Sequence, residues 1–225
     1  MVRQLSHDGD AVGDPRDFAD RAACRNAACA SALRRAYRRR AQRERTGERP
    51  DLSIPARTTA GYLALLEAAF LIHRVPAWST NLSRKVIRRP KLVVSDSGLA
   101  CHLLGVTGAT LDRPGRPLGP LLETFVANEI RKQLTWSTER PSLWHFRDRG
   151  GAEVDLVLEH PDGRVCGIEV KATSTPRAED LRGLRYLAER LDDRFQFGVL
   201  LTAAPEATPF GPTLAALPVS TLWAG

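Results

Sequence analysis

The segment from residue 151 to residue 171 constrains the fold of this chain more than any other part of the sequence. It holds two short apolar stretches separated by the tetrapeptide His160-Pro161-Asp162-Gly163. A sequence of this kind is typical of the turn that closes a β-hairpin. When the two stretches fold back on each other as strands, they can bring Asp155 beside Glu169. The segment therefore predicts a hairpin that pairs two acidic residues.

The alternation of polar and apolar residues predicts which side chains share a face of the hairpin. In an extended strand alternate side chains lie on the same face, so Glu153 and Asp155 are expected opposite Val154 and Leu156. Two carboxylates held close together repel each other unless a cation lies between them. Hard oxygen ligands of this type suit magnesium or manganese.

Lys171 follows Glu169 by two residues and is expected to face the same pocket. A lysine at that position could orient a water molecule or stabilise the negative charge that develops when a phosphodiester is attacked. The alternative is an ordinary strand with one solvated face, in which Glu169 and Lys171 form a common surface pair.

Asp155, Glu169 and Lys171 resemble the signature of the PD-(D/E)xK nuclease superfamily. The wider sequence resembles one uncharacterised group in it, the domain of unknown function 4143 (DUF4143), found C-terminal in many prokaryotic AAA-type ATPases. The landmarks of this resemblance are Thr58 to Leu63 with Leu66-Glu67, Pro90 to Val94 with Asp96 to Ala100, and Leu122 to Glu129. The resemblance implies an α/β fold, in which a partial winged-helix segment precedes a restriction endonuclease-like α-β-β-β-α-β core.

The resemblance also implies that the first helix of the core supplies one more acid, for which Glu123 is the candidate. On a helical projection Glu123 falls within the apolar arc that holds Leu122 and Val126. A carboxylate on an apolar face is costly unless it has a partner, such as a metal ion or Lys171. Glu129 lies on the same broad arc and is the rival, and either acid could instead be a side chain that snorkels at the edge of the core.

Positive charge is concentrated near the N-terminus. The chain has a formal net charge of +7, and residues 34–49 contribute eight arginines against two glutamates, a net of +6. Such a run can bind phosphate backbones without sequence preference, or it can be a solvated, partly helical segment.

A second basic cluster lies where the hairpin of a winged helix is expected. Its members are Arg84, Lys85, Arg88, Arg89 and Lys91. A wing that tracks a DNA backbone would use residues of this kind. The alternatives are a solvated hairpin and a surface that docks an acidic partner.

Several classes of protein are not expected. The chain contains no phosphate-binding loop of the form G-x-x-x-x-G-K-[ST], so ATP is not expected as a cofactor and the chain is not expected to be an ATPase by itself. The first half of the winged-helix part is also expected to be absent or replaced by residues 1–50, which a truncated gene, a shifted reading frame or a wrongly assigned start could each explain. There is no apolar run of transmembrane length and no secretory signal, and the scattered cysteines indicate reduced thiols, so we expect a cytoplasmic protein without membrane contact.

The sequence predicts four regions. They are a basic N-terminal segment at 1–50, the partial winged-helix segment at 51–106, a linker at 107–119 and the nuclease-like domain at 120–225. Helices are expected from Thr58, at 97–104, 120–134 and 177–191, and strands at 70–75, 92–95, 143–147, 152–158, 164–171 and 197–202.

The leading hypothesis is a magnesium- or manganese-dependent phosphodiesterase that acts on DNA. Asp155 and Glu169 would hold the metal, Glu123 would assist, Lys171 would position the attacking water, and Glu153 would be a neighbouring strand-face acid. The main alternative is a catalytically inactive module of an ATPase system that binds a partner protein or DNA. A third possibility is a DNA-binding regulator that uses the helix from Thr58.

Overall fold

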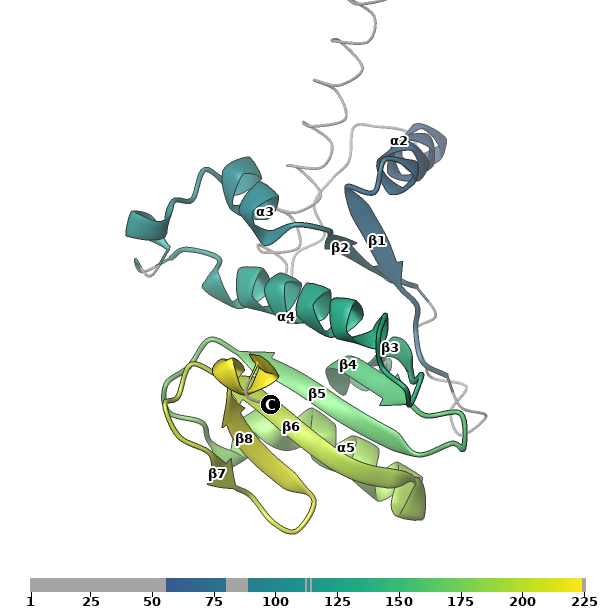
Figure 1. Cartoon of the computed structure of the whole chain (residues 1–225), viewed down its shortest axis with the longest axis vertical. Helices are drawn as coiled ribbons and strands as arrows, with labels where there is room; N and C mark the ends of the chain where they lie inside the picture. The colour runs from purple at the N-terminus through teal and green to yellow at the C-terminus, as the bar shows by residue number, and fades with distance from the viewer. Residues whose placement is uncertain (1–55, 80–88, 112, 114, 224–225) are drawn as a thin grey trace, which may run out of the picture.

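A six-stranded mixed sheet with one helix on each face organises the C-terminal half of the chain (Figure 1). The computed structural model describes residues 56–79, 89–111, 113 and 115–223. The strands are β3 (Ser142–Arg147), β4 (Glu153–Glu159), β5 (Val165–Lys171), β6 (Phe195–Thr202), β7 (Thr208–Pro209) and β8 (Leu214–Pro218). They lie in the order β3-β4-β5-β6-β8-β7, with β5, β6 and β8 parallel to one another.

The predicted hairpin joins β4 and β5, which pair antiparallel. At the turn, the amide of Gly163 donates a hydrogen bond to the carbonyl of His160 over 2.8 Å. Gly163 has a φ of 91°, a conformation that glycine adopts without steric cost. The predicted turn chemistry is therefore confirmed.

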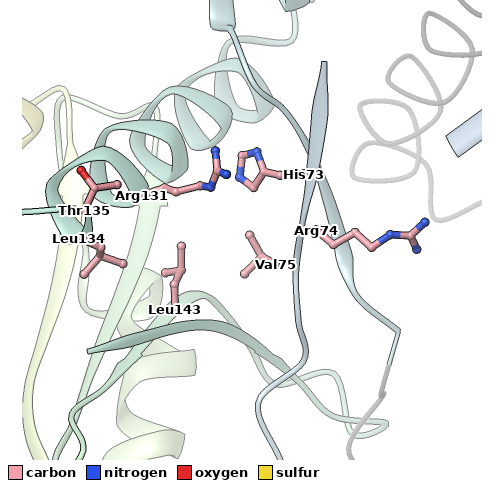
Figure 2. Close-up of a pocket in the computed structure, with 7 residues that line it drawn as sticks. All are labelled: His73, Arg74, Val75, Arg131, Leu134, Thr135 and Leu143. Carbon is pink, nitrogen blue, oxygen red and sulfur yellow. The ribbon is translucent and has the colours of Figure 1, made fainter. Parts of the chain in front are cut away.

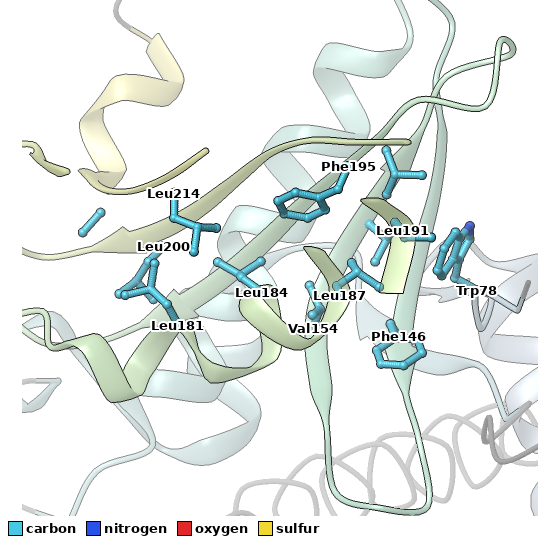
Figure 3. Packing of buried hydrophobic residues seen from close by; sticks show 13 residues of the cluster. Trp78, Phe146, Val154, Leu181, Leu184, Leu187, Leu191, Phe195, Leu200 and Leu214 are labelled. Atoms are coloured by element: carbon cyan, nitrogen blue, oxygen red, sulfur yellow. The ribbon is translucent and has the colours of Figure 1, made fainter. Parts of the chain in front are cut away.

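Helix α5 (Arg182–Leu191) covers one face of the sheet, and the short 3-10 helix η2 (Ala178–Leu181) leads into it. Its leucines pack on valines and leucines of four strands, as Figure 3 shows. The helix lies close to the sheet because Gly167 and Gly198 stand beneath it, and an added Cβ at Gly167 would lie 2.7 Å from the Leu184 side chain. The buried members of this first core are Trp78, Phe146, Val154, Val157, Val165, Leu181, Leu184, Leu187, Leu191, Phe195, Leu200, Leu214 and Ala216.

Helix α4 (Leu118–Leu134) covers the other face and is itself covered by the N-terminal part of the described chain (Figure 1). Its apolar residues pack between the sheet and a two-stranded ribbon of β1 (Ile72–Val75) and β2 (Lys91–Val94). The buried members of this second core are Val75, Val93, Val126, Ala127, Ile130, Leu156, Ile168, Val170 and Leu201. Helix α4 is thus the central layer between two strand layers.

Hydrogen bonds attach the β1–β2 ribbon and the chain that follows it to the C-terminal half. The Asn128 side chain of α4 donates to the carbonyl of Val94 over 2.9 Å. The chain after β1 runs along the edge strand β3, where the amide of Trp78 donates to His145 over 2.7 Å and the amide of His145 donates to Pro76 over 3.0 Å. These bonds fix the position of β2 relative to α4 and the large sheet.

Two helices flank the ribbon, α2 (Ala56–Ala68) and α3 (Ser97–Leu104). Helix α3 has the predicted bounds, because Asp96 caps its first turn by accepting from the amide of Leu99 over 2.6 Å and Gly105 ends it with a φ of 65°. The short 3-10 helix η1 (Gly108–Thr110) lies in the segment that was predicted to be a linker.

The structure corrects several predicted bounds. The helix predicted from Thr58 includes earlier residues, since the described part of α2 begins at Ala56. Phe70 is not in a strand: it has a φ of 58° and its side chain is 82% exposed, so it belongs to the turn before β1. Strands β7 and β8 were not predicted. The order α4-β3-β4-β5-α5-β6 agrees with the predicted helix, three strands, helix and strand.

Candidate functional site

Asp155 lies at the point where β4 and β5 separate. The hydrogen-bonded ladder between these strands runs from the pair Glu159–Val165 to the pair Leu156–Ile168 and stops there. Beyond it, the amide of Val170 donates to Oδ2 of Asp155 over 3.0 Å. A carboxylate therefore takes the place of the next backbone partner, and this bond fixes Asp155 between the two strands.

A β-bulge in β4 determines which face Asp155 and its neighbours occupy. The paired residues on either side of the bulge are Trp144 with Val157 and Phe146 with Val154. One residue of β3 thus faces two of β4, Asp155 and Leu156. As a result Val154 and Val157 both belong to the core beneath α5, whereas Leu156 belongs to the core beneath α4. The prediction that Val154 and Leu156 share a face was wrong, because strict alternation does not hold across a bulge.

Lys91 of β2 enters the acidic cluster from the ribbon above α4. Its Nζ lies 2.9 Å from Oδ1 of Asp155 and also contacts Oε1 of Glu123. The lysine side chain is only 11% exposed. The sequence analysis grouped Lys91 with a surface that follows DNA, but the structure places it inside the cluster, because its position in β2 directs it towards α4 and the large sheet.

Arg89 is the one other residue of the proposed DNA-binding cluster that the structure describes, and it does not join Lys91. Arg89 is exposed, and its backbone carbonyl lies 3.0 Å from Nε2 of His145. Arg84, Lys85 and Arg88 lie outside the described residues.

Glu123 is the acid that α4 contributes to the site. It is 8% exposed and forms an ion pair with Lys91, a partner that the sequence analysis did not name. Its rival Glu129 forms an ion pair with Lys132, one turn further along the helix. Of the two candidate acids on α4, Glu123 is thus the one that points into the cluster.

Glu169 and Lys171 form the part of the cluster nearest to solvent. Nζ of Lys171 lies 3.0 Å from Oε1 of Glu169, and the lysine side chain is 44% exposed while that of Glu169 is 10% exposed. Oε2 of Glu169 is buried and has no hydrogen-bond partner among the described residues. Burial and, next, the charge of Asp155 raise the pKa of Glu169 to about 8.

The charges of the cluster do not balance. Three carboxylates, Glu123, Asp155 and Glu169, face two ammonium groups, Lys91 and Lys171, so the fully ionised cluster has a net charge of −1. Burial opposes ionisation of Asp155, but the charge and hydrogen bond of Lys91 outweigh burial and hold the pKa of Asp155 below its usual value. The uncompensated charge falls on Glu169, which must take up a proton or a cation.

Glu153 lies outside this cluster. Its carboxylate is 3.6 Å from Nε of Arg147, and both side chains are about two-fifths exposed. It is a surface acid on the same strand as Asp155, so it can serve as a control for substitutions of Asp155.

The donor chemistry of the cluster fits a divalent cation at Glu169 and Asp155. Both residues offer hard oxygens, and the free Oε2 of Glu169 is an oxygen without a partner. Between Glu123 and Asp155, in contrast, the ammonium of Lys91 takes the position of a cation. In the described part of the chain, no three His, Cys, Asp or Glu side chains are grouped as a metal site.

Two parts of this chain match models of known domains. The model of a domain of unknown function (DUF4143) matches residues 118–222. The predicted resemblance to that domain is confirmed for this region. The model of a second domain of unknown function (DUF8612) matches residues 15–110, a range that contains Lys91 and runs across the predicted boundary at residue 50.

The curated relatives are also uncharacterized. One protein of Mycobacterium tuberculosis and one of Mycobacterium bovis are each 31% identical to this chain over 125 residues, which is 56% of the chain. The match covers 27% of the length of each relative. No solved structure matches the chain significantly.

No helix in the described ranges is both long and apolar enough to cross a membrane.

Proposed function

We propose that the C-terminal domain is a metal-dependent phosphodiesterase of the PD-(D/E)xK type that acts on DNA. The observation that carries the proposal is the burial of Asp155 and Glu169 at the separating ends of β4 and β5, with Glu123 and two lysines converging on them. Burying three carboxylates in one place costs free energy that a purely structural role would not require. Perturbed acids gathered in this way are typical of functional sites.

Each residue of the cluster has a distinct task in this proposal. Asp155 and Glu169 would hold a magnesium or manganese ion, and Glu123 would assist. When bound, the ion would supply positive charge that polarises a phosphate oxygen and lowers the pKa of a bound water.

Lys171 is the group best suited to meet the substrate. Its side chain is 44% exposed, and its ammonium is anchored by Glu169 at the solvent side of the cluster. From this position it can donate a hydrogen bond to a water molecule or to a non-bridging oxygen of a phosphodiester. Lys91 is mostly shielded from solvent and ion-paired, so its task is to keep Glu123 and Asp155 together.

The same contacts of Lys91 favour a second candidate function. Because its ammonium satisfies Glu123 and Asp155 without a metal ion, the cluster could be a structural ion-pair network in a catalytically inactive binding module. Such a module of an ATPase system would dock a partner protein or DNA without cutting it.

Plasmid nicking separates the two functions. Wild-type protein with manganese is expected to convert supercoiled plasmid to the nicked form, and Asp155→Asn and Lys171→Gln are expected to reduce the rate by about 100-fold or more. The matched control is Glu153→Gln, which removes a carboxylate from the same strand outside the cluster and should keep the wild-type rate. Nicking that Asp155→Asn leaves unchanged would come from a contaminant or another site and would overturn the proposal.

DNA binding is tested apart from cleavage. Replacing Arg84, Lys85 and Arg88 by glutamine should weaken binding to all sequences alike and reduce the slope of log K against log salt by about one per lost phosphate contact. Unchanged affinity and slope would show that this basic segment does not bind DNA. Asp155→Asn is the control and should bind DNA as the wild type does.

A further inference from the structure

A cavity of about 240 Å³ lies away from the acidic cluster, between β1, the C-terminal end of α4 and β3 (Figure 2). Its described lining residues are His73, Arg74, Val75, Arg131, Leu134, Thr135 and Leu143. Glu123 and Arg131 both belong to α4 and are eight positions apart, or roughly 12 Å along the helix axis. The cavity is therefore a separate site from the cluster around Asp155.

His73 is the buried polar group of this cavity. It is 8% exposed, and neither ring nitrogen has a hydrogen-bond partner among the described residues. An imidazole buried in this way loses its bonds to water and gains none in exchange. Burial and the neighbouring charge of Arg131 lower the pKa of His73 to about 4, so the ring is neutral near pH 7 and offers one N–H donor.

Arg131 provides positive charge beside His73. Figure 2 shows the guanidinium of Arg131 and the ring of His73 directed towards one another at one side of the cavity. No ion pair is found for Arg131 within the described ranges, whereas Arg74 points away from the cavity and pairs with Glu67 at 2.8 Å. The cavity thus has a net charge of +1 from Arg131.

The opposite walls of the cavity are apolar. They come from Val75, Leu134 and Leu143, as Figure 2 also shows. A site with one cationic end, one neutral donor and a hydrocarbon wall is complementary to a small molecule that has one negative charge and a short apolar body. The volume lies just below the range of roughly 300–1,000 Å³ typical of drug-sized ligands, so the ligand must be small.

We propose that this cavity is a binding site for a small organic monocarboxylate. The carboxylate would accept two hydrogen bonds from the guanidinium of Arg131 and one from the ring N–H of His73, and the hydrocarbon part would lie against Val75, Leu134 and Leu143. A phosphate monoester is a poorer match, because it brings up to two negative charges to a site that has one positive charge. The proposal does not depend on the phosphodiesterase function.

Titration of the full chain with three probes tests the proposal. Butanoate, its neutral analogue butanamide and inorganic phosphate are added separately, and binding is followed through the ¹⁵N and ¹H resonances of the His73 ring. Butanoate is expected to bind saturably and at least about tenfold more tightly than butanamide or phosphate, since it alone combines one negative charge for the exposed guanidinium of Arg131 with an apolar body for the hydrocarbon wall. Saturable shifts of the His73 resonances place the ligand in this cavity.

Two variants complete the test. Arg131→Gln should reduce butanoate affinity at least about tenfold, whereas Arg182→Gln, which removes an exposed arginine from α5, should leave it unchanged. His73→Leu, whose butanoate affinity is measured by calorimetric titration, should also weaken butanoate binding and should fold, since it replaces an unpartnered imidazole by an apolar group. The proposal is overturned if butanoate does not bind saturably, if butanamide or phosphate binds as tightly, or if Arg131→Gln binds butanoate like the wild type.

Discussion

Lys91 and Asp155 are 64 positions apart in the sequence and form an ion pair of 2.9 Å in the interior of the protein. Lys91 belongs to β2 of the small ribbon and Asp155 to β4 of the large sheet. This pair therefore joins a segment matched by DUF8612 to a segment matched by DUF4143. The acidic cluster is complete only when both segments are in place.

Removal of the Lys91 charge should destabilise the protein strongly. Lys91→Met keeps the length of the side chain but leaves Glu123 and Asp155 buried without their counter-charge, so we expect a loss of about 3–5 kcal/mol in the free energy of unfolding. Urea denaturation measures the effect. The control is Lys132→Met, which removes a lysine that is 60% exposed and should cost less than about 1 kcal/mol. Equal losses in the two variants would contradict a buried role for Lys91.

The raised pKa of Glu169 should make the protein less stable in alkaline solution. This pKa is raised to about 8 in the folded state, so between the ordinary carboxyl pKa and pH 8 the folded state binds a proton that the unfolded state has released. Stability is therefore lost as the pH rises through this window. Glu169→Gln mimics the protonated side chain and should gain at least about 1 kcal/mol relative to the wild type between pH 6 and pH 9. A constant difference between the two proteins across this range would rule out the raised pKa.

The lowered pKa of His73 should make the protein less stable in acid. This pKa is lowered to about 4, so between pH 6.5 and pH 4 the unfolded state binds a proton that the folded state does not. Stability falls as the pH falls through this window, by about 3 kcal/mol in total for a shift of this size. Thermal denaturation of the wild type and of His73→Leu from pH 7 to pH 4 measures this effect. The variant should lose less stability in acid than the wild type, and parallel curves would contradict the prediction.

Gly183 should not tolerate a side chain, even though it lies in a helix. A Cβ at this position would lie 2.0 Å from the carbonyl oxygen of Glu153, a backbone atom that cannot move away without disturbing β4. Gly183→Ala should therefore cost more than about 2 kcal/mol, through overpacking. Gly61 in α2 is the matched control: it has open space around its Cβ position, and alanine there should stabilise the helix by about 0.5–1 kcal/mol. Stabilisation by Gly183→Ala would show that α5 does not lie this close to β4.

The sequence predicted the local parts of this site because they depend on local rules. The turn at residues 160–163 follows from the conformational preferences of a few adjacent residues. The acids Asp155, Glu169 and Glu123 come together as expected, since the hairpin pairs the first two and the helical period places the third on the apolar face of α4.

The rest of the site depends on contacts between distant segments. The bulge at Asp155 is invisible in a pattern of alternating residues, because it arises from the way β3 pairs with β4. Lys91 was assigned to the surface because it lies next to other basic residues in the sequence. The available signal was its alternation with Val93, a buried residue on the same face of β2, which argues for an inward direction.

Strand β8 was not predicted from the sequence for a different reason. Its residues Leu214–Pro218 follow a glycine- and proline-rich stretch and include a proline, features that argue against a strand within a sheet. The strand forms because β6 offers it a parallel partner, while the short β7 pairs with its other edge. Tertiary pairing thus outweighs the local preference.

Calorimetric titration with manganese tests the central claim most directly, namely that Asp155 and Glu169 take up a divalent cation. Wild-type protein and Glu153→Gln should bind one ion per chain with the same affinity, and Asp155→Asn should bind at least about tenfold more weakly, because loss of a ligating carboxylate removes both charge and a donor oxygen. Binding should also release protons near pH 7, since Glu169 must ionise to bind the ion. The account is contradicted if wild-type protein takes up no manganese, or if Asp155→Asn binds it as tightly as the wild type.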